Sequence, residues 1–397
     1  MPKNVWAMGL VSFFNDIASE TIYPIVPIFL TTVLGAPVAI VGLIEGLAES
    51  VSSILKVFSG WFSDRIGKRK PLVVLGYSIS TVSKLVMGLA NDWPLVLFSR
   101  FLDRFGKGAR VAARDALIVE SVAPAIRGRA FGLNRALDSA GAVIGPLLAL
   151  LMLAVFKDNF KTIFFVAAIP AAIGVLVLVL LVREARPATN KLHKQIKLSQ
   201  VKNFHPVLKI FLLVSAVFAI GNSSDAFLIL RAKDLGLTTI LAVAAYVLFN
   251  ICYSAFSYPA GAWSDKIGAK KILVIGFATF TLVYGALALI NQSIWLWIIF
   301  PIYGFYMAMT DGVSKSYMSS MVQPEISGTA FGLQQTIVGL GAFVASLTAG
   351  YLWHFSPSLP FWLGSAMSFI ALIIFLSYRG TPKSADQKIS DAPIAHN

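Results

Sequence analysis

Apolar residues occur along the chain in long runs, which short polar stretches separate. Each run approaches the length of about 20 residues that an α-helix needs to cross a bilayer. We count 12 such runs, at residues 6–30, 39–62, 71–90, 93–118, 129–154, 162–182, 207–230, 239–262, 271–290, 294–318, 329–353 and 359–378. The pattern predicts an all-α integral membrane protein with 12 transmembrane helices, in contact with the lipid bilayer.

The composition supports this prediction. Hydrophobic residues make up 57% of the chain and charged residues 13%, whereas a soluble domain carries about 25% charged residues. A net charge of +14 could indicate binding to nucleic acid. The basic residues, however, lie in short loops between apolar runs, where they orient a protein in the membrane. We therefore expect no nucleic-acid partner.

The basic residues also predict the topology. They are concentrated in alternate loops on one side, which is typical of the cytoplasmic side of a cell (inner) membrane. Both termini and the polar connector 183–206 are then cytoplasmic. No small-residue cleavage site follows the first run, so we expect this span to be retained. The polar tail 381–397 is expected to be disordered.

The two halves of the chain repeat each other. The segment GWFSDRIGKRK at 60–70 matches GAWSDKIGAKK at 261–271, and RGRAFGLNRALDSAGA at 127–142 matches SGTAFGLQQTIVGLGA at 327–342. This repeat predicts two pseudo-symmetric six-helix bundles, 1–182 and 207–380. Parallel repeats of this kind are typical of transporters with a site between the bundles, near the midplane.

Two motifs make the chain similar to the major facilitator superfamily. The loop motif G-x-x-x-D-R-x-G-(R/K)-(R/K) of that family is matched in the first half by Gly60, Asp64, Arg65 and Gly67, and in the second by Gly261, Asp265 and Gly268. The glycine pattern of its fifth helix is matched by Gly141, Gly145 and Pro146, but Ala149 and Leu150 replace the usual final glycine pair.

The resemblance implies a bacterial-type 12-helix permease that works by alternating access. It also implies that the motif residues control the switch between the outward-open and inward-open forms. Physically, glycines allow close helix approach, and the loop's basic residues can hold it at anionic headgroups. The alternative is that these basic residues only enforce topology. A monomer that binds a small molecule, without cofactor or metal, is expected.

The fourth span, 93–118, carries charged residues that hydrocarbon would not tolerate. They are Arg100, Asp103, Arg104, Lys107, Arg110, Arg114 and Asp115. Each would cost about 2.5–3.5 kcal/mol near the bilayer centre if it faced lipid. Steps of three and four place most of them on one side of a helix, which favours a positively charged wall of a solute pathway. The alternative, a cytoplasmic amphipathic helix, is disfavoured because the flanking spans require a crossing here.

Carboxylates on neighbouring spans could face this wall. Asp16 and Glu20 share one face of the first span, while Glu45, Glu49, Ser52 and Lys56 form a stripe on the second. A buried carboxylate beside an arginine stays ionised, and it takes a proton when that partner is lost. The predicted proton-coupling residues are Asp16, Glu20, Glu49 and Asp138. Static ion pairs are the alternative for each. Lys84 in the third span either snorkels or partners an acid.

The net positive charge of the fourth span favours an anionic substrate, because arginine binds carboxylate and phosphate in a bidentate way. Arg100, Arg104 and Lys107 are its predicted main contacts. The further predicted substrate-binding residues are Asn15, Arg135, Asn222, Asp225, Tyr246, Asn250, Asp311 and Gln334. For the polar residues outside the fourth span, hydrogen bonds that pack helices are the alternative.

The leading hypothesis is therefore a proton-coupled secondary transporter of an organic (poly)carboxylate anion, such as a carboxylate siderophore. The chain has no phosphate-binding G-x-x-x-x-G-K-[ST] loop, which argues against coupling to ATP. A proton-driven efflux antiporter for multiple drugs or lipophilic cations is the second hypothesis, and a sugar transporter the third. A non-transporting sensor on the same fold is a different class. An enzyme is disfavoured, because no histidine lies in a span and Cys252 stands alone.

Overall fold

The computed structural model describes residues 1–66, 69–123, 126–157, 159–184, 206–322 and 327–378. The side chains of residues 57–58, 60–66, 127–128 and 327–329 are also outside this description. Most of the predicted connector 183–206, and the whole predicted tail 381–397, therefore lie outside the described residues.

The described residues form helices and contain no strand, which confirms the all-α prediction. In the first half the helices are α1 (Lys3–Ile22), α2 (Val26–Ile28), α3 (Val38–Ile66), α4 (Lys70–Gly88), α5 (Trp93–Glu120), α6 (Arg127–Phe156) and α7 (Phe160–Leu181). In the second half they are α8 (Pro206–Gly221), α9 (Ala226–Asp234), α10 (Thr239–Ile267), α11 (Ala269–Leu289), α12 (Leu296–Ser319), α13 (Ser327–Trp353) and α14 (Leu359–Ser377).

Ten helical segments of the described chain are long and apolar enough to cross a membrane, with α8 and α9 counted as one. The two remaining spans, α1 and α5, fall short because of their polar and charged residues. The N-terminus of α5 is nevertheless stabilised. The Asp92 side chain accepts a hydrogen bond from the Leu95 N–H, and Pro94 lies in the first turn. It is packed between α3 and α4, so protein rather than lipid covers much of its charged surface.

Two of the predicted spans are not continuous helices. The first breaks after Ile22, and Pro24 lies in the break before α2 begins at Val26. Proline lacks the N–H that a helix needs and clashes with the preceding turn. The seventh breaks between Gly221 and Ala226, where Asn, Ser and Asp side chains compete with the helical backbone bonds. The prediction of one helix over each of these runs was therefore wrong.

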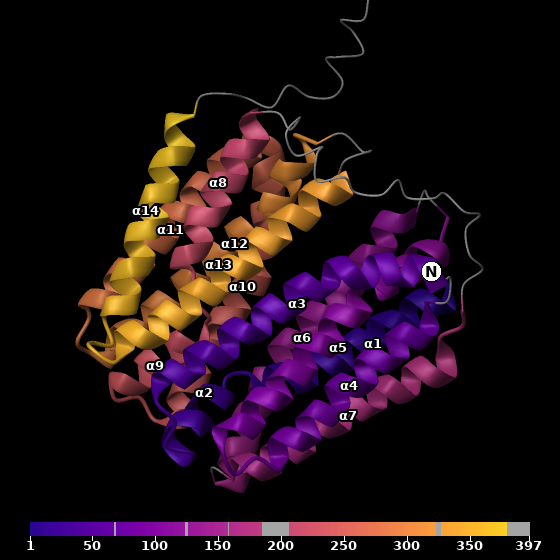
Figure 1. The fold of residues 1–397 in the computed structure, drawn as a ribbon, viewed down its shortest axis with the longest axis horizontal. Helices are drawn as coiled ribbons and strands as arrows, with labels where there is room; N and C mark the ends of the chain where they lie inside the picture. The colour runs from indigo at the N-terminus through magenta and orange to yellow at the C-terminus, as the bar shows by residue number, and fades with distance from the viewer. Residues whose placement is uncertain (67–68, 124–125, 158, 185–205, 323–326, 379–397) are drawn as a thin grey trace, which may run out of the picture.

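The packing repeats between the halves. α1 contacts α6 and α7 as α8 contacts α13 and α14, and α3 contacts α5 as α10 contacts α12. Likewise α4 packs on α5 and α7 as α11 packs on α12 and α14. The sequence repeat thus corresponds to a repeat of helix contacts. α4, α7, α11 and α14 lie at the outside of their bundles (Figure 1).

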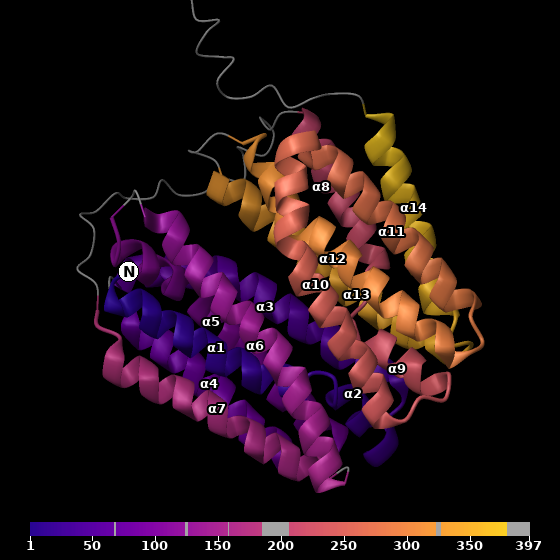
Figure 2. The ribbon, with the colours of Figure 1, turned by 180° about the vertical axis from the view of Figure 1, so that it is seen from behind.

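The bundles meet through α3 with α13, α6 with α10, and α2 with α9. They lie close together where α2 and α9 meet, and they diverge toward the N-terminus (Figures 1 and 2). We call these the closed end and the open end. At the closed end α3 and α13 touch through glycines, because a Cβ on Gly42 would lie 2.2 Å from the Ser346 carbonyl oxygen. A Cβ on Gly350 would lie 2.9 Å from the Cα of Ala39.

Candidate functional site

The charged side chains of α5 turn into the protein. Arg100, Asp103, Arg104 and Arg110 are between 5% and 9% exposed. This burial agrees with the expectation that hydrocarbon does not contact them. Gly106 and Gly108 on the same helix allow it to approach its neighbours, since a Cβ on Gly106 would lie 2.5 Å from the Gly76 carbonyl oxygen of α4.

Three ion pairs connect α5 with α3 and α4. The Nη2 of Arg100 lies 2.7 Å and 2.6 Å from the two carboxylate oxygens of Glu45. The Nη2 of Arg104 lies 3.0 Å from Glu49 Oε1, and the Nζ of Lys84 lies 3.3 Å from Asp103 Oδ1. Lys84 is therefore the partner of an acid and does not snorkel.

These pairs correct the charge argument made from the sequence. The positive excess of the fourth span was the basis for an anionic substrate. Glu45 and Glu49 of α3 offset much of that excess, because they bind the arginines directly. Sequence reasoning placed both acids on one stripe but did not pair them with particular bases, since the register between two helices depends on packing.

Other charged groups in the same place have no counter-ion. Asp16, Glu20 and Lys107 form no ion pair within 4.0 Å in the described part of the chain. All three line one cavity of about 30 Å³. Its other lining residues are Asn15, Ser19, Tyr23, Arg100, Asp103, Arg104 and Arg110. This central cavity thus contains paired and unpaired charges side by side.

The glycines of α6 bring that helix against the two acids of α1. A Cβ on Gly141 would lie 3.0 Å from the Cβ of Asp16, and one on Gly145 would lie 2.7 Å from the Cβ of Glu20. The motif glycines therefore allow the backbone of α6 to reach the turns that carry both carboxylates. Asp138, on the same helix, has a buried Oδ1 that makes no hydrogen bond with the described residues.

Charged side chains of both bundles are accessible to solvent beyond the cavity. The side chains of Glu49, Arg135 and Lys315 are 43%, 61% and 54% exposed. Two contacts join the bundles there. The Nη2 of Arg135 lies 3.2 Å from Asp311 Oδ2 and also donates to the Tyr253 hydroxyl at 3.1 Å. These contacts are therefore exposed to solvent rather than buried.

Hydrogen bonds join the bundles at the closed side of the cavity. The Tyr246 hydroxyl donates to Glu20 Oε2 at 3.2 Å. The hydroxyls of Tyr23 and Ser224, in the breaks of the first and seventh spans, lie 3.1 Å apart. Ser224 also donates to Glu45 Oε2 at 3.5 Å. The two helix breaks therefore meet beside the Arg100–Glu45 ion pair.

Some of the predicted substrate residues lie away from the cavity. Asn250 and Gln334 are each 6% exposed, and neither lines it. The Nδ2 of Asn250 donates instead to the Tyr246 carbonyl oxygen in its own helix. The backbone N–H of Asn222 bonds the preceding turn. Asp225 lies in the second helix break and accepts a 2.6 Å bond from the Tyr303 hydroxyl.

Several residues of the site were not selected from the sequence. Glu45 and Lys84 were noticed by their spacing or position but not assigned to the site. Tyr23 and Ser224 were noticed among the polar residues of their spans, but their contact arises from helix breaks that were not predicted. Tyr303 was not singled out, and its bond to Asp225 also depends on the second break.

The predicted switch motif is only partly described. The side chains of Gly60, Asp64 and Arg65, and all of Gly67, lie outside the described residues. In the second copy Gly268 ends α10 with φ +96°, a conformation that favours glycine. Asp265 is exposed and Gly261 has open space around its Cα. The switching role of these residues stays a prediction.

Comparison with known proteins agrees with this architecture. A family model of the Major Facilitator Superfamily matches residues 8–251 and 210–395. An uncharacterized MFS-type transporter of Methanocaldococcus jannaschii is 40% identical over 382 residues, which cover 95% of each chain. Multidrug resistance protein MdtH of Enterobacter is 25% identical over 371 residues, 91% of this chain and 90% of that protein.

Solved structures share the fold. The nucleoside transporter NupG superposes with a TM-score of 0.79 at 12% identity, covering 94% of this chain and 99% of that one. A D-xylose-proton symporter superposes with a TM-score of 0.75 at 16% identity, covering 96% and 98%. The chain therefore belongs to the Major Facilitator Superfamily, and it is a multi-pass membrane transporter rather than an enzyme.

Proposed function

We propose that this transporter is coupled to protons and that Asp16 and Glu20 carry them. One observation supports this assignment above the others. Both acids line the central cavity without a counter-ion in the described chain, whereas Glu45, Glu49 and Asp103 are each held by a cation. A carboxylate without a counter-ion in a confined, wet site is suited to exchange protons, while one beside a guanidinium favours its charged form.

Glu49 and Asp138 have secondary roles in this proposal. Glu49 is bound to Arg104 in the present conformation, but its side chain is 43% exposed. It can therefore exchange Arg104 for a proton or a substrate group when the bundles move. Asp138 adds a third acid beside α1, with one oxygen still free of hydrogen bonds.

We propose an organic anion as substrate, with its acidic group at Lys107. Lys107 is a cation of the cavity that pairs with no acid of the described residues, and it lies with Asp16 and Glu20. When those acids are protonated, they no longer compete for the ammonium group. Proton and anion then bind together, which produces symport. A polycarboxylate, such as a carboxylate siderophore, would in addition need Arg104 to leave Glu49.

A second candidate function is the export of lipophilic cations. Asp16 and Glu20 could bind a cation directly when they are ionised, and relatives at 22–25% identity are named multidrug resistance proteins. A cation and a proton would then compete for the same carboxylates, which produces antiport. The charge of the substrate thus determines whether transport is symport or antiport with protons.

We further propose that the open end faces the cytoplasm of a cell (inner) membrane and that the chain works as a monomer. The basic loops, both termini and the connector all belong to that end by the topology derived from the sequence. The present shape then corresponds to an inward-facing state. The predicted boundaries of the two bundles, 1–182 and 207–380, are kept in this proposal.

The test is a binding screen of the purified protein at two pH values, about 5.5 and 7.5. Carboxylates with perturbed pKa values change their protonation state between them. Organic polycarboxylates and tetraphenylphosphonium serve as probes, and the unfolding temperature reports binding. Anion symport predicts stronger stabilisation by the anion at the lower pH, and cation antiport predicts stronger stabilisation by the cation at the higher pH.

Glu20→Gln should reduce either pH effect, because the amide cannot exchange the proton. Glu120→Gln, at the far end of α5, is the matched control and should leave the pH effect as it is. Binding of a probe by the unmodified protein that does not change with pH would contradict proton coupling at this site.

A further inference from the structure

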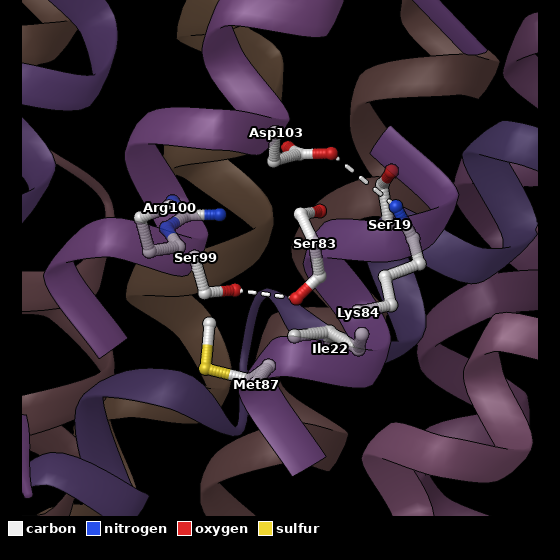
Figure 3. A pocket seen from close by; sticks show the side chains of 8 residues that line it. All are labelled: Ser19, Ile22, Ser83, Lys84, Met87, Ser99, Arg100 and Asp103. Carbon is white, nitrogen blue, oxygen red and sulfur yellow. Dashed lines mark hydrogen bonds and ion pairs between the residues drawn. The ribbon is translucent and has the colours of Figure 1, made fainter. Parts of the chain in front are cut away.

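A second, smaller cavity lies behind the central one, between α1, α4 and α5. Its volume is about 20 Å³. Its lining residues are Ser19, Ile22, Ser83, Lys84, Met87, Ser99, Arg100 and Asp103. Figure 3 shows the Lys84 side chain reaching toward Asp103, with Ser19 of α1 beside them. A cavity needs about 10–15 Å³ of this kind of volume to hold one water molecule, so this cavity has room for one.

The polar atoms around this space need a further partner. The Nζ of Lys84 donates to the Ser80 carbonyl oxygen at 3.1 Å and to Asp103 Oδ1 at 3.3 Å. An ammonium group has three N–H donors, so one remains. The Nε of Arg100 is buried and finds no acceptor in the part of the chain that the structure describes. A water in the cavity could accept from Lys84 and Arg100 and donate to Asp103 or Ser19, which satisfies the requirement of several polar partners.

The small cavity adjoins the central one. Ser19, Arg100 and Asp103 line both of them. Ser19 lies on α1 between Asp16 and Glu20 in the sequence, and it lines both cavities. A chain of hydrogen bonds can therefore run from Lys84 through a water and the Ser19 hydroxyl to the acids of α1.

We propose that the Lys84–Asp103 pair is a second proton-exchange site of the transporter, joined to Glu20 by this water and Ser19. The inference rests on the proposed proton coupling and extends it to the side of α5 that faces α4. In the transfer, the Lys84 ammonium gives a proton to the water. The water passes a proton through the Ser19 hydroxyl to the Glu20 carboxylate, which leaves a neutral amine and a neutral acid. The reverse transfer reloads Lys84.

The charges that surround the pair come from three neighbouring helices. They are Asp16 and Glu20 on α1, Glu45 and Glu49 on α3, and Arg100, Arg104, Lys107 and Arg110 on α5. α7 packs on the other side of α4, and its one charged residue, Lys161, bonds Asn91 near the helix end. The proton affinity of the pair therefore responds to the state of Asp16 and Glu20.

The competing explanation is a fixed ion pair that only holds α4 to α5. Buried ion pairs are often structural, and their charges do not change over the physiological range. Such a pair would bind the same number of protons at every pH near neutrality. A count of protons therefore separates the two explanations, and it requires no knowledge of the substrate.

The experiment is a proton titration of the purified full chain in detergent between about pH 5 and pH 9, a range in which unperturbed Lys and Asp do not titrate. The unmodified protein is compared with the double variant Lys84→Met/Asp103→Asn, which removes both charges together and leaves no buried ion unpaired. We expect the double variant to take up about one proton fewer per molecule. An equal count would overturn the proposal.

The route is tested with Ser19→Val, which removes the hydroxyl and fills the small cavity. Proton uptake after a pH jump should become at least tenfold slower in this variant. Ser99→Ala is the control, because Ser99 lines the same cavity but donates to the Ser83 carbonyl oxygen, on the side away from Ser19 (Figure 3). Equal rates in Ser19→Val and the unmodified protein would also overturn the proposal, even if the double variant failed to fold.

The two proposals fail in different ways. If Glu20→Gln keeps the full pH effect on ligand binding, proton coupling at the α1 acids is wrong. If Glu20→Gln loses that effect and the double variant titrates like the unmodified protein, only the second site is wrong.

Discussion

Arg100 and Arg104 lie one helical turn apart on α5, and their ion-pair partners have very different surroundings. The Glu45 side chain beside Arg100 is 2% exposed, while the Glu49 side chain beside Arg104 is 43% exposed. Removing one partner of a buried pair leaves a charge that water cannot reach. Removing Arg104 instead leaves the Glu49 carboxylate, which water can solvate. The same substitution should therefore affect folding at one position and transport at the other.

We predict that Arg100→Ala destabilises the protein by about 3–5 kcal/mol, the usual cost of an orphaned buried charge. Arg104→Ala should cost less, because the Glu49 carboxylate that remains is reached by water, yet it should abolish transport. Thermal unfolding in detergent measures the first effect, and flux in liposomes the second. Adding Glu45→Gln to Arg100→Ala should restore part of the stability, because the buried charge is then gone. Equal unfolding temperatures for the two single variants would contradict this assignment.

At the scale of elements, glycine decides how closely α3 and α13 approach. A Cβ on Gly42 would lie 2.2 Å from the Ser346 carbonyl oxygen, which no real contact tolerates, so the helices must separate when one is added. Gly46 repeats the contact one turn further along, where a Cβ would lie 3.1 Å from the Phe343 carbonyl oxygen. The closed end thus depends on a row of backbone contacts rather than on long side chains.

Gly42→Ala should lower the unfolding temperature and weaken the closed end. The matched control is Gly312→Ala on α12, where a Cβ would meet no atom within 4 Å. That change should be neutral or stabilising by up to about 1 kcal/mol, because alanine is the better helix former. Thermal unfolding of both variants in the same detergent checks the prediction. A loss of stability from Gly312→Ala as large as that from Gly42→Ala would show that close helix approach is not the cause.

At the scale of the whole molecule, one hydrogen bond connects the proton site with the conformation. Tyr246 of the second bundle donates to Glu20 of the first at the closed end. A bond to a charged acceptor is worth about 1.5–3 kcal/mol, which corresponds to more than a tenfold change in a two-state equilibrium. Neutralising Glu20 should therefore loosen the closed end and let the open end close.

This coupling can be measured as a distance across the open end. Spin labels attached through Arg129→Cys and Ser320→Cys, in a Cys252→Ser background, lie on exposed positions of opposite bundles. We expect the long distance to dominate in the parent chain and a shorter one to gain population in Glu20→Gln. Tyr246→Phe should produce a shift at least as large, since it removes the bond that Glu20→Gln only weakens. Unchanged distance distributions in both variants would mean that the bond does not couple the bundles.

The sequence was informative about which residues avoid lipid. The runs of apolar residues, the repeat of the loop motif and the charges of the fourth span predicted the helices, the family and the buried faces. The breaks in the first and seventh spans were missed, although Pro24 and the polar run 222–225 were present. Whether such residues kink or interrupt a helix depends on what the neighbouring helices supply to the freed backbone groups.

The sequence by itself thus determined that these side chains must share one interior, because a bilayer accepts neither unpaired charge nor unpaired backbone. Only the tertiary structure decided the partners. The spacing of Glu45, Glu49, Arg100 and Arg104 allows several pairings, and the register of α3 against α5 selects one of them. Packing also brings Asp16, Glu20 and Lys107 to one cavity, where none of them forms an ion pair with another described residue. Charge composition is a property of the chain, whereas charge neutralisation depends on distances that only packing sets.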